Sequence, residues 1–314
     1  ATQLSKDSRV PNQQTILEEI FEEDDDEKPI ISDKVVAEEI DQENKFKEHA
    51  GHNWLEKYMK NENYGIIDNE AGGDCLFATI RDAYSGIGKN IDVADLRNIA
   101  SNAATETTFQ NFKEQYDMYA TEVTTLGAQL SILQTQNKAL KQQYRQTKDR
   151  DAKAQLVAKS KPLIAKFKQA KKEKKAASEL LHEYRWMRGV DTLEKLKKKM
   201  RTCGFWAESW TLQTLEQALN VKLIILSSFN YMHRDYDNIL SCGDMAPTVM
   251  VSKGVFKPKY YIIVEHTGSH YKLITYKDIK IFRFHKIIPF GGKQMNRILA
   301  VATLLGITGC GYTQ

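Results

Sequence analysis

Apolar and polar residues alternate along the chain in patterns that predict two globular regions separated by a long helical one. Short apolar runs at 64–67, 221–226, 260–264 and 271–275 have the length and composition of β-strands. A polar, glycine-containing turn at 265–269 separates the last two runs. These two runs therefore predict a β-hairpin.

Other segments space their apolar residues as helices do. Apolar positions from Leu76 to Tyr84 follow a glycine-rich turn, and a second helix is expected from Asp92, which can act as its N-cap. A third helix beginning near Trp210 leads directly into the strand at 221–226. Together these elements predict an α/β (α+β) fold, in which helices flank a small mixed sheet.

The middle of the chain, from about Phe112 to Met187, is rich in Lys, Gln, Ala, Glu and Leu, which is typical of long helices. Two series of residues recur there at steps of four and three, and they differ in phase. The first is Leu126, Leu130, Leu133, Asn137, Leu140 and Tyr144, and the second is Leu156, Ser160, Leu163, Phe167, Ala170, Lys174, Ala177 and Leu181. We expect two helices folded into a hairpin, with a dimeric coiled coil as the alternative. The chain would turn either at the phase slip near Arg150-Asp151 or at the helix-start signal Ser160-Lys161-Pro162.

Charge is distributed unevenly along the chain. The whole sequence has 45 Lys+Arg and 41 Asp+Glu, a formal net charge of +4, which does not by itself indicate a nucleic-acid-binding protein. Residues 1–50 contain 15 Asp+Glu and 6 Lys+Arg, whereas residues 138–201 contain 21 Lys+Arg and 7 Asp+Glu. The acidic segment predicts a solvated extension or an arm for a basic partner. The basic region predicts a solvated helix face or a site for an acidic partner, a membrane headgroup or nucleic acid.

Length and composition limit the class of protein. A chain of 314 residues with 41% hydrophobic residues can bury a sizeable core, which excludes disorder throughout and collagen-like structure. The four cysteines form no Cys-x-x-Cys pair, and no secretory signal sequence is recognisable, so we expect a soluble protein in the reducing intracellular compartment. The apolar stretch 298–307 is too short for a transmembrane segment and predicts a terminal helix packed on the core.

Cys75 is the strongest candidate for chemistry. It follows Gly72-Gly73-Asp74 and opens the predicted apolar helix. A helix N-terminus stabilises a thiolate, and flexible glycines allow backbone N–H groups to approach a substrate carbonyl, as an oxyanion hole requires. The alternative is that Cys75 is a small apolar core residue.

A nucleophilic cysteine needs a base, and His270 stands at the start of the second hairpin strand, where the scaffold can orient its imidazole. His266 and His270 together could offer two nitrogens to zinc. No cysteine or carboxylate cluster supplies the remaining ligands at a known spacing. The sequence therefore predicts neither a metal site nor a cofactor.

Several segments resemble the ovarian-tumour (OTU) family of cysteine proteases. The segment 72–80, Gly-Gly-Asp-Cys-Leu-Phe-Ala-Thr-Ile, is similar to the family's nucleophile motif, and Asp95-Leu-Arg97 is similar to the short motif that follows it. The segment 205–219 resembles the tryptophan-centred helix before the central strand, and 268–274, Gly-Ser-His-Tyr-Lys-Leu-Ile, resembles the histidine motif. These segments occur in the family's order.

The resemblance covers roughly residues 53–110 and 184–285 and implies a papain-type core that is interrupted by a coiled-coil insertion. The expected division is an acidic N-terminal extension at 1–50, a first half of the core with the nucleophile at 51–110, a basic helical hairpin at 111–185, a second half with the catalytic histidine at 186–290, and a C-terminal tail at 291–314.

The resemblance also implies roles for individual residues. Cys75 would be the nucleophile and His270 the general base, while the backbone amides of Gly73, Asp74 and Cys75 would line the oxyanion hole. The family usually has Asp or Asn two residues after the histidine, but this chain has Lys272, and it has Gly72 in place of an Asp three residues before the cysteine. The acid that orients His270 must come from elsewhere. The candidates are Asp68, Asp74 and Asp278, and Asp68 is preferred because some relatives supply this acid from upstream of the cysteine.

The implied function is a cysteine-dependent deubiquitinase that hydrolyses isopeptide bonds of ubiquitin or polyubiquitin conjugates through a thioester, without a cofactor. One alternative is a catalytically weak or inactive ubiquitin-binding adaptor. Another is a nucleic-acid or assembly protein that acts through the basic arm. The resemblance extends to viral members of the family, and the expected location is the cytoplasm, which would be the host cytoplasm for a viral protein.

Overall fold

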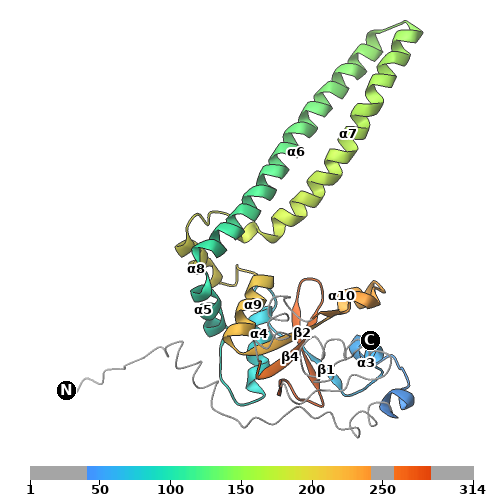
Figure 1. Cartoon of the computed structure of the whole chain (residues 1–314). Helices are drawn as coiled ribbons and strands as arrows, with labels where there is room; N and C mark the ends of the chain where they lie inside the picture. Colours follow the sequence, from blue (N-terminus) through green and yellow to red (C-terminus); the bar gives the residue numbers. More distant parts are fainter. Residues whose placement is uncertain (1–40, 242–257, 284–314) are drawn as a thin grey trace, which may run out of the picture. The chain divides into compact units, whose positions relative to one another are not determined.

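The structure is a computed structural model of the chain, and it describes residues 41–241 and 258–283 (Figure 1). The chain divides into two compact units, one formed by residues 1–103 and 200–314 and the other by residues 104–199. We call them the sheet unit and the helical unit. Most of the acidic extension, the predicted terminal helix at 298–307 and the tail at 291–314 lie outside the described residues.

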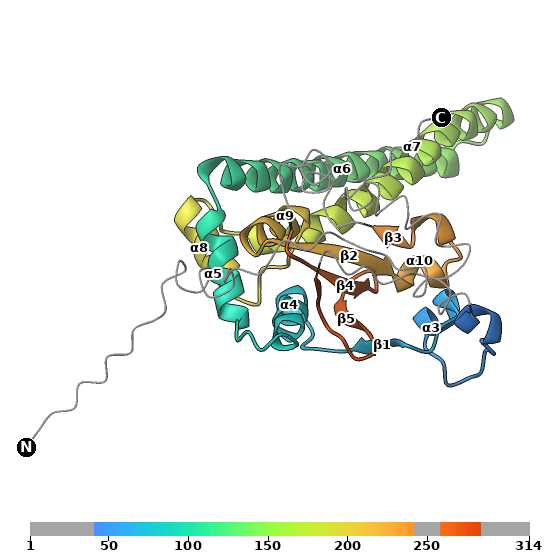
Figure 2. The ribbon, with the colours of Figure 1, turned by 60° about the horizontal axis from the view of Figure 1, so that its bottom comes forward.

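A mixed β-sheet forms the centre of the sheet unit. Its described strands are β1 (Tyr64–Ile67), β2 (Val221–Ser227), β3 (Leu240–Ser241), β4 (Tyr260–His266), β5 (Tyr271–Tyr276) and β6 (Phe282–Arg283). They are ordered β1-β5-β4-β2-β3, and β6 pairs with β4 (Figure 2). The β2–β4 pair is parallel and the other pairs are antiparallel. The four predicted strands and the predicted hairpin of β4 and β5 are confirmed.

Helices flank this sheet, as the spacing of apolar residues predicts. The helices of the sheet unit include α3 (Trp54–Met59), α4 (Cys75–Ser85), α5 (Val93–Ala103), α9 (Ser209–Ala218), α10 (Ser228–Met232) and the short 3₁₀ helix η2 (Tyr236–Asn238). Helix α4 packs against β5, and α9 packs against β2 and α5. Both central strands, β2 and β4, are buried along nearly their whole length because helices cover the sheet. The fold class is α+β with a small mixed sheet.

Two long helices dominate the helical unit, α6 (Glu106–Gln146) and α7 (Arg150–Glu183), and they run side by side (Figure 1). The 3₁₀ helix η1 (Arg185–Met187) and α8 (Leu193–Met200) follow. Asp149 caps α7 by accepting hydrogen bonds from the N–H groups of Asp151 and Ala152, so the chain turns at the phase slip. The alternative start at Ser160-Lys161-Pro162 is wrong, since Pro162 lies inside α7.

The two predicted series of apolar residues meet between these helices. Leu126 and Leu133 of α6 are buried, as are Ala170 and Ala177 of α7. The polar members also meet, because Ser160 Oγ lies 3.3 Å from Asn137 Oδ1. The helices therefore pair within one chain. No helix of the described residues is long and apolar enough to cross a membrane.

Candidate active site

Asp68 and His270 lie together at one end of the sheet. Strand β1 pairs with β5 so that Ile67 is opposite Leu273, and Asp68, the next residue, continues this register to lie opposite Lys272. His270 immediately precedes β5, and its Nε2 atom lies 2.9 Å from Asp68 Oδ1. The sheet therefore brings the predicted base next to the preferred candidate acid, although 202 positions separate them in the sequence.

Cys75 is the first residue of α4, and its side chain is buried. Helix α4 packs against β5, and the backbone N–H of Tyr271 is near enough to the Cys75 sulfur to lower the pKa of the thiol. Because Tyr271 directly follows His270, the structure brings the predicted nucleophile to the same end of β5 as the predicted base. Three candidates chosen from distant parts of the sequence thus converge on one place.

Burial governs the titration of Cys75. It raises the pKa of the thiol above its usual value, although the backbone N–H groups of Tyr271, Leu76 and Cys75 itself act in the opposite direction. The carboxylate of Asp74 also raises this pKa. The backbone N–H groups at the start of α4 lower this pKa, in the direction that the helix N-terminus predicts, but desolvation of the buried thiol outweighs them. A nucleophile in this position needs a base to accept its proton.

The loop before Cys75 requires both of its glycines. Gly72 has φ = 92°, a conformation that residues with a Cβ rarely adopt. Gly73 lies so close to the following part of the sheet unit that a Cβ would stand 2.1 Å from the carbonyl oxygen of Cys203 and 2.6 Å from that of Phe205. The first glycine supplies a turn, and the second allows two backbone segments to touch.

Arg97 fixes this loop from α5. Its buried guanidinium donates to Asp74 Oδ1 at 2.7 Å and to the carbonyl oxygens of Gly73 at 2.8 Å and Met200 at 2.7 Å. It also lies over the Phe77 ring, 4.3 Å from the ring centroid. The segment Asp95-Leu-Arg97 was expected only as a short motif, with no role predicted for Arg97. A single arginine in an amphipathic helix gives no further signal of such a network.

The predicted oxyanion residues, Gly73 and Asp74, form the turn that leads into α4. Arg97 binds the Gly73 carbonyl and the Asp74 carboxylate, so the acceptors of this turn are occupied. Within the described part of the chain, the N–H groups of Gly73 and Asp74 have no hydrogen-bond partner. The N–H of Cys75 makes a long contact of 3.5 Å to the Gly72 carbonyl and also lowers the pKa of its own thiol. The turn thus offers N–H donors beside the Cys75 sulfur.

Asn69 is a residue of the site that the sequence analysis missed. Its Nδ2 atom lies 3.3 Å from the Cys75 carbonyl, 2.8 Å from Thr79 Oγ1 and 3.2 Å from the Tyr271 carbonyl. Its backbone N–H donates to Asp68 Oδ1 at 2.9 Å. One side chain therefore ties the start of α4 to the start of β5. The only sequence signal was its position next to Asp68.

The other candidate acids are not available to His270. Asp74 binds Arg97, and Asp278 follows the end of β5 that is opposite to His270. Lys272 cannot accept the imidazole proton, but its Nζ atom lies 2.7 Å from Asp68 Oδ2. Lys272 and His270 together lower the pKa of Asp68 well below its usual range, with the lysine as the larger cause. The acid is therefore charged at neutral pH.

A separate cluster of His49, His52 and Glu62 has the residue types of a metal site, with ligand atoms within 4.8 Å of one another. His52 already uses both ring nitrogens, since Nδ1 accepts from the His49 N–H at 3.3 Å and Nε2 lies 3.2 Å from Glu62 Oε1. A neutral His52 with this tautomer donates to Glu62 and has no free nitrogen for a metal. The hydrogen bonds explain the cluster without an ion.

Comparisons with known proteins do not assign this chain to a family. No protein-family model matches the chain, and no curated protein matches it. A solved structure of an ovarian tumour (OTU) domain in complex with ubiquitin is 15% identical, over 78% of this chain and 88% of that chain, with a TM-score of 0.34. A likeness of this size carries no argument about function.

Proposed function

We propose that the chain is a cysteine-dependent deubiquitinase with an OTU-like, papain-type core at 51–110 and 186–290, into which the helical hairpin at 111–185 is inserted. The observation that carries this proposal is the convergence of Cys75, His270 and Asp68 at one end of β5. Nucleophile, base and orienting acid are the groups that thiol-dependent hydrolysis needs. Their order along the chain and their surrounding residues resemble the OTU motifs.

In the proposed reaction, His270 accepts the proton of the Cys75 thiol, and the thiolate attacks the carbonyl carbon of the isopeptide bond. The N–H groups of Gly73, Asp74 and Cys75 bind the oxyanion that forms. His270 then gives its proton to the leaving lysine amine, which leaves a thioester on Cys75. Water, deprotonated by His270, hydrolyses the thioester and restores the thiol. Asp68 binds Nε2 of His270, so Nδ1 is the nitrogen that faces the thiol.

The test is reaction of the full chain with ubiquitin carrying a C-terminal electrophile. We expect a covalent adduct that Cys75→Ala abolishes and that forms roughly 100-fold more slowly in His270→Ala. Cys203→Ala is the matched control, because Cys203 is an exposed cysteine of the same unit and lies outside the proposed triad. A folded protein that reacts with neither ubiquitin nor ubiquitin-like probes would exclude the protease. Binding of ubiquitin without reaction would favour the adaptor.

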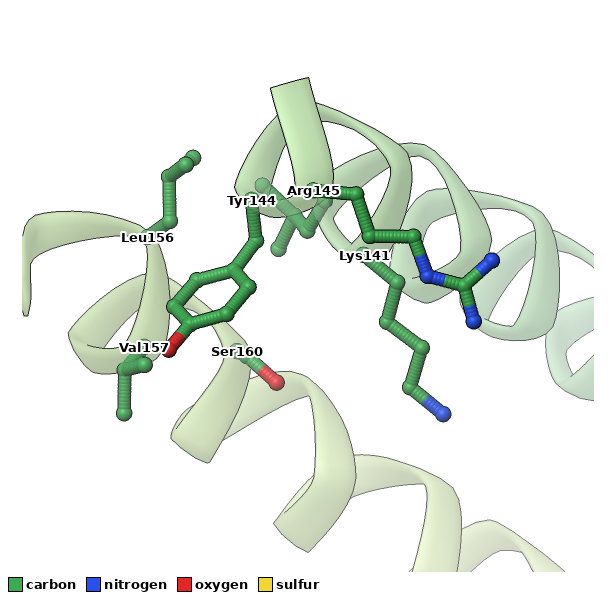
Figure 3. A pocket seen from close by; sticks show the side chains of 7 residues that line it. Lys141, Tyr144, Arg145, Leu156, Val157 and Ser160 are labelled. Carbon is green, nitrogen blue, oxygen red and sulfur yellow. The ribbon is translucent and has the colours of Figure 1, made fainter. Parts of the chain in front are cut away.

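A groove in the helical unit supports a second candidate function, docking of an acidic partner. The groove measures about 320 Å³ and is lined by Leu140, Lys141, Tyr144, Arg145, Leu156, Val157 and Ser160. Figure 3 shows the Tyr144 ring reaching from α6 toward Val157 and Ser160, with Lys141 and Arg145 extending on the other side of it. Apolar side chains beside two cations fit an acidic peptide with an apolar residue. Lys153 lies over the Tyr144 ring, 5.2 Å from its centroid, where a nucleic-acid base would have to stack.

This docking function is tested with a fluorescent peptide in which glutamates flank one leucine. We expect binding that is lost when that leucine is replaced by serine, or when the protein carries Val157→Glu. Lys172→Glu on α7, outside the groove, is the matched charge control and should leave binding unchanged. Equal loss in both variants, or preferential binding of single-stranded RNA, would contradict a peptide site.

A further inference from the structure

We propose that Lys272 is a positioning residue, which holds Asp68 toward His270 and limits how strongly Asp68 stabilises the charged imidazole. This inference rests on the proposed function. The two oxygens of the Asp68 carboxylate bind different partners, because Oδ1 lies 2.9 Å from His270 Nε2 and Oδ2 lies 2.7 Å from Lys272 Nζ. A single carboxylate thus connects the base to a permanent cation.

Asp68 needs such an anchor because most of its side chain is in water. It follows the last residue of β1 and is 62% exposed, whereas the Lys272 side chain is 25% exposed and belongs to β5. An exposed carboxylate at a strand end can turn between rotamers, and each rotation away from His270 leaves the imidazole without its acceptor. The ion pair to a residue of a paired strand selects the rotamer in which Oδ1 meets His270.

The sheet register places Lys272 between two carboxylates. Glu265 of β4 is opposite Lys272, and the β1–β5 register continued by one residue puts Asp68 on its other side. Side chains at opposite positions of neighbouring strands lie on the same face of a sheet. The Glu265 carboxylate accepts a hydrogen bond from Trp54 Nε1 at 2.7 Å, and Lys272 binds Asp68. The two carboxylates beside Lys272 therefore have different donors, Trp54 for Glu265 and Lys272 for Asp68.

The charge of Lys272 also affects the reaction. The titratable groups that the described residues place around the His270–Asp68 pair include Cys75 of α4 with the neighbouring Asp74, Glu265 and His266 of β4, and Tyr271 and Lys272 of β5. Lys272 is the permanent cation among these. Its positive charge opposes the protonated form of His270, while Asp68 favours that form. Removing the lysine charge should let His270 keep its proton to a higher pH, and it should also release Asp68 from its rotamer.

The experiment measures the rate of adduct formation with the ubiquitin electrophile from mildly acidic to alkaline pH. For Lys272→Met we expect a plateau rate about 10-fold lower, because the acid is no longer held. We also expect the acidic limb, where His270 is protonated and cannot accept the thiol proton, to move up by about half a pH unit. Lys272→Arg should restore both. Lys277→Met, which removes a lysine just beyond the other end of β5, should behave as the unmodified chain.

Several results would overturn the proposal. One is a Lys272→Met protein with unchanged plateau and acidic limb. Another is a loss of rate that arginine does not restore and that leaves the limb in place, since this would show that the lysine only packs. Lys272→Gln provides a second uncharged variant if thermal unfolding shows that Lys272→Met is not folded.

Failure of the proposed function gives a different result. If the unmodified chain forms no adduct with any ubiquitin or ubiquitin-like probe, the protease itself is excluded. The contact can still be tested by following the imidazole NMR signal of His270 with pH, which needs no substrate. We expect this signal to change at a higher pH in Lys272→Met than in the unmodified chain. Identical titrations would contradict the role of Lys272.

Discussion

The residues around Cys75 are held by contacts between positions far apart in the sequence, whereas the hairpin of α6 and α7 is held by contacts that repeat along two helices. Arg97 binds the carbonyl of Met200, and Asp68 binds His270. In the hairpin, Leu126, Leu133, Ala170 and Ala177 are the buried members of the two predicted series, and residues such as Val157 and Ile164 are exposed. A substitution near Cys75 should therefore change stability and chemistry together. A substitution in the hairpin should have a smaller, local effect.

The two arginines Arg97 and Arg145 give the sharpest form of this contrast. Arg97→Met leaves the Asp74 carboxylate and the carbonyls of Gly73 and Met200 without their buried donor, so we expect a loss of about 3–5 kcal/mol in the free energy of unfolding. Arg145→Met, at an exposed position near the end of α6, should change it by less than about 0.5 kcal/mol. Urea unfolding measures both values. Similar losses in the two variants would show that the hydrogen bonds of Arg97 to Asp74, Gly73 and Met200 do not stabilise the fold.

Two glycine-to-alanine substitutions should act with opposite signs. Gly73→Ala places a Cβ against the rigid carbonyls of Cys203 and Phe205, and we expect a destabilisation of about 3 kcal/mol with loss of adduct formation. At Gly127, inside α6, the nearest atom to a new Cβ is the flexible Lys174 Nζ at 3.2 Å. Alanine is the better helix former, so Gly127→Ala should stabilise by about 0.5–1 kcal/mol. Thermal and urea unfolding of the two variants measure both changes in stability. A stabilised Gly73→Ala protein would contradict the close approach of Gly73 to the carbonyls of Cys203 and Phe205.

The sequence allowed prediction of the elements whose pattern is local. The strands at 64–67, 221–226, 260–264 and 271–275 and the turn at the phase slip before α7 follow from apolar periodicity and end signals. The phase slip near Arg150-Asp151 marked the turn, whereas Pro162 gave a false start signal, because this proline lies inside α7. The position of each element in the sheet could not be read from periodicity.

The sequence singles out a site residue where that residue has both a chemical role and a distinctive neighbourhood. Cys75 and His270 met this condition, and Asp68 was chosen from a resemblance that left three acids open. Asn69, Arg97 and the contact of Lys272 with Asp68 were missed because their roles arise from pairing between distant segments. The net rise in the pKa of Cys75 could not be predicted for a similar reason, since the burial of the thiol is a property of the assembled core.

Asn69 and Asn137 both hold two segments together, but only Asn69 should affect the chemistry. Asn69→Ala removes the donor shared by the carbonyls of Cys75 and Tyr271, and we expect about 10-fold slower adduct formation and about 1–2 kcal/mol of lost stability. Asn137→Ala removes the contact with Ser160 and should leave the adduct rate unchanged. The rates with the ubiquitin electrophile and the urea midpoints check both expectations. A normal rate in folded Asn69→Ala would remove Asn69 from the site.

The smallest expected effect is the pH dependence of stability that arises from Asp68. Its pKa lies below the unfolded value of 3.8, so the Lys272 and His270 contacts stabilise the folded chain when the carboxylate is charged. This contribution is fully present above about pH 5 and is lost as the pH falls below 3.8 toward the folded pKa. Because Asp68 is mostly exposed, we expect Asp68→Asn to cost less than about 1 kcal/mol near neutral pH and almost nothing in acid.

Lys195 lowers the pKa of Asp191 in the helical unit through an ion pair between residues four positions apart. Asp191→Asn should therefore show a weaker form of the same pH dependence. Urea unfolding of both variants at a series of pH values measures the difference, and a cost of Asp68→Asn that is independent of pH would show that the ion pair with Lys272 does not form in solution.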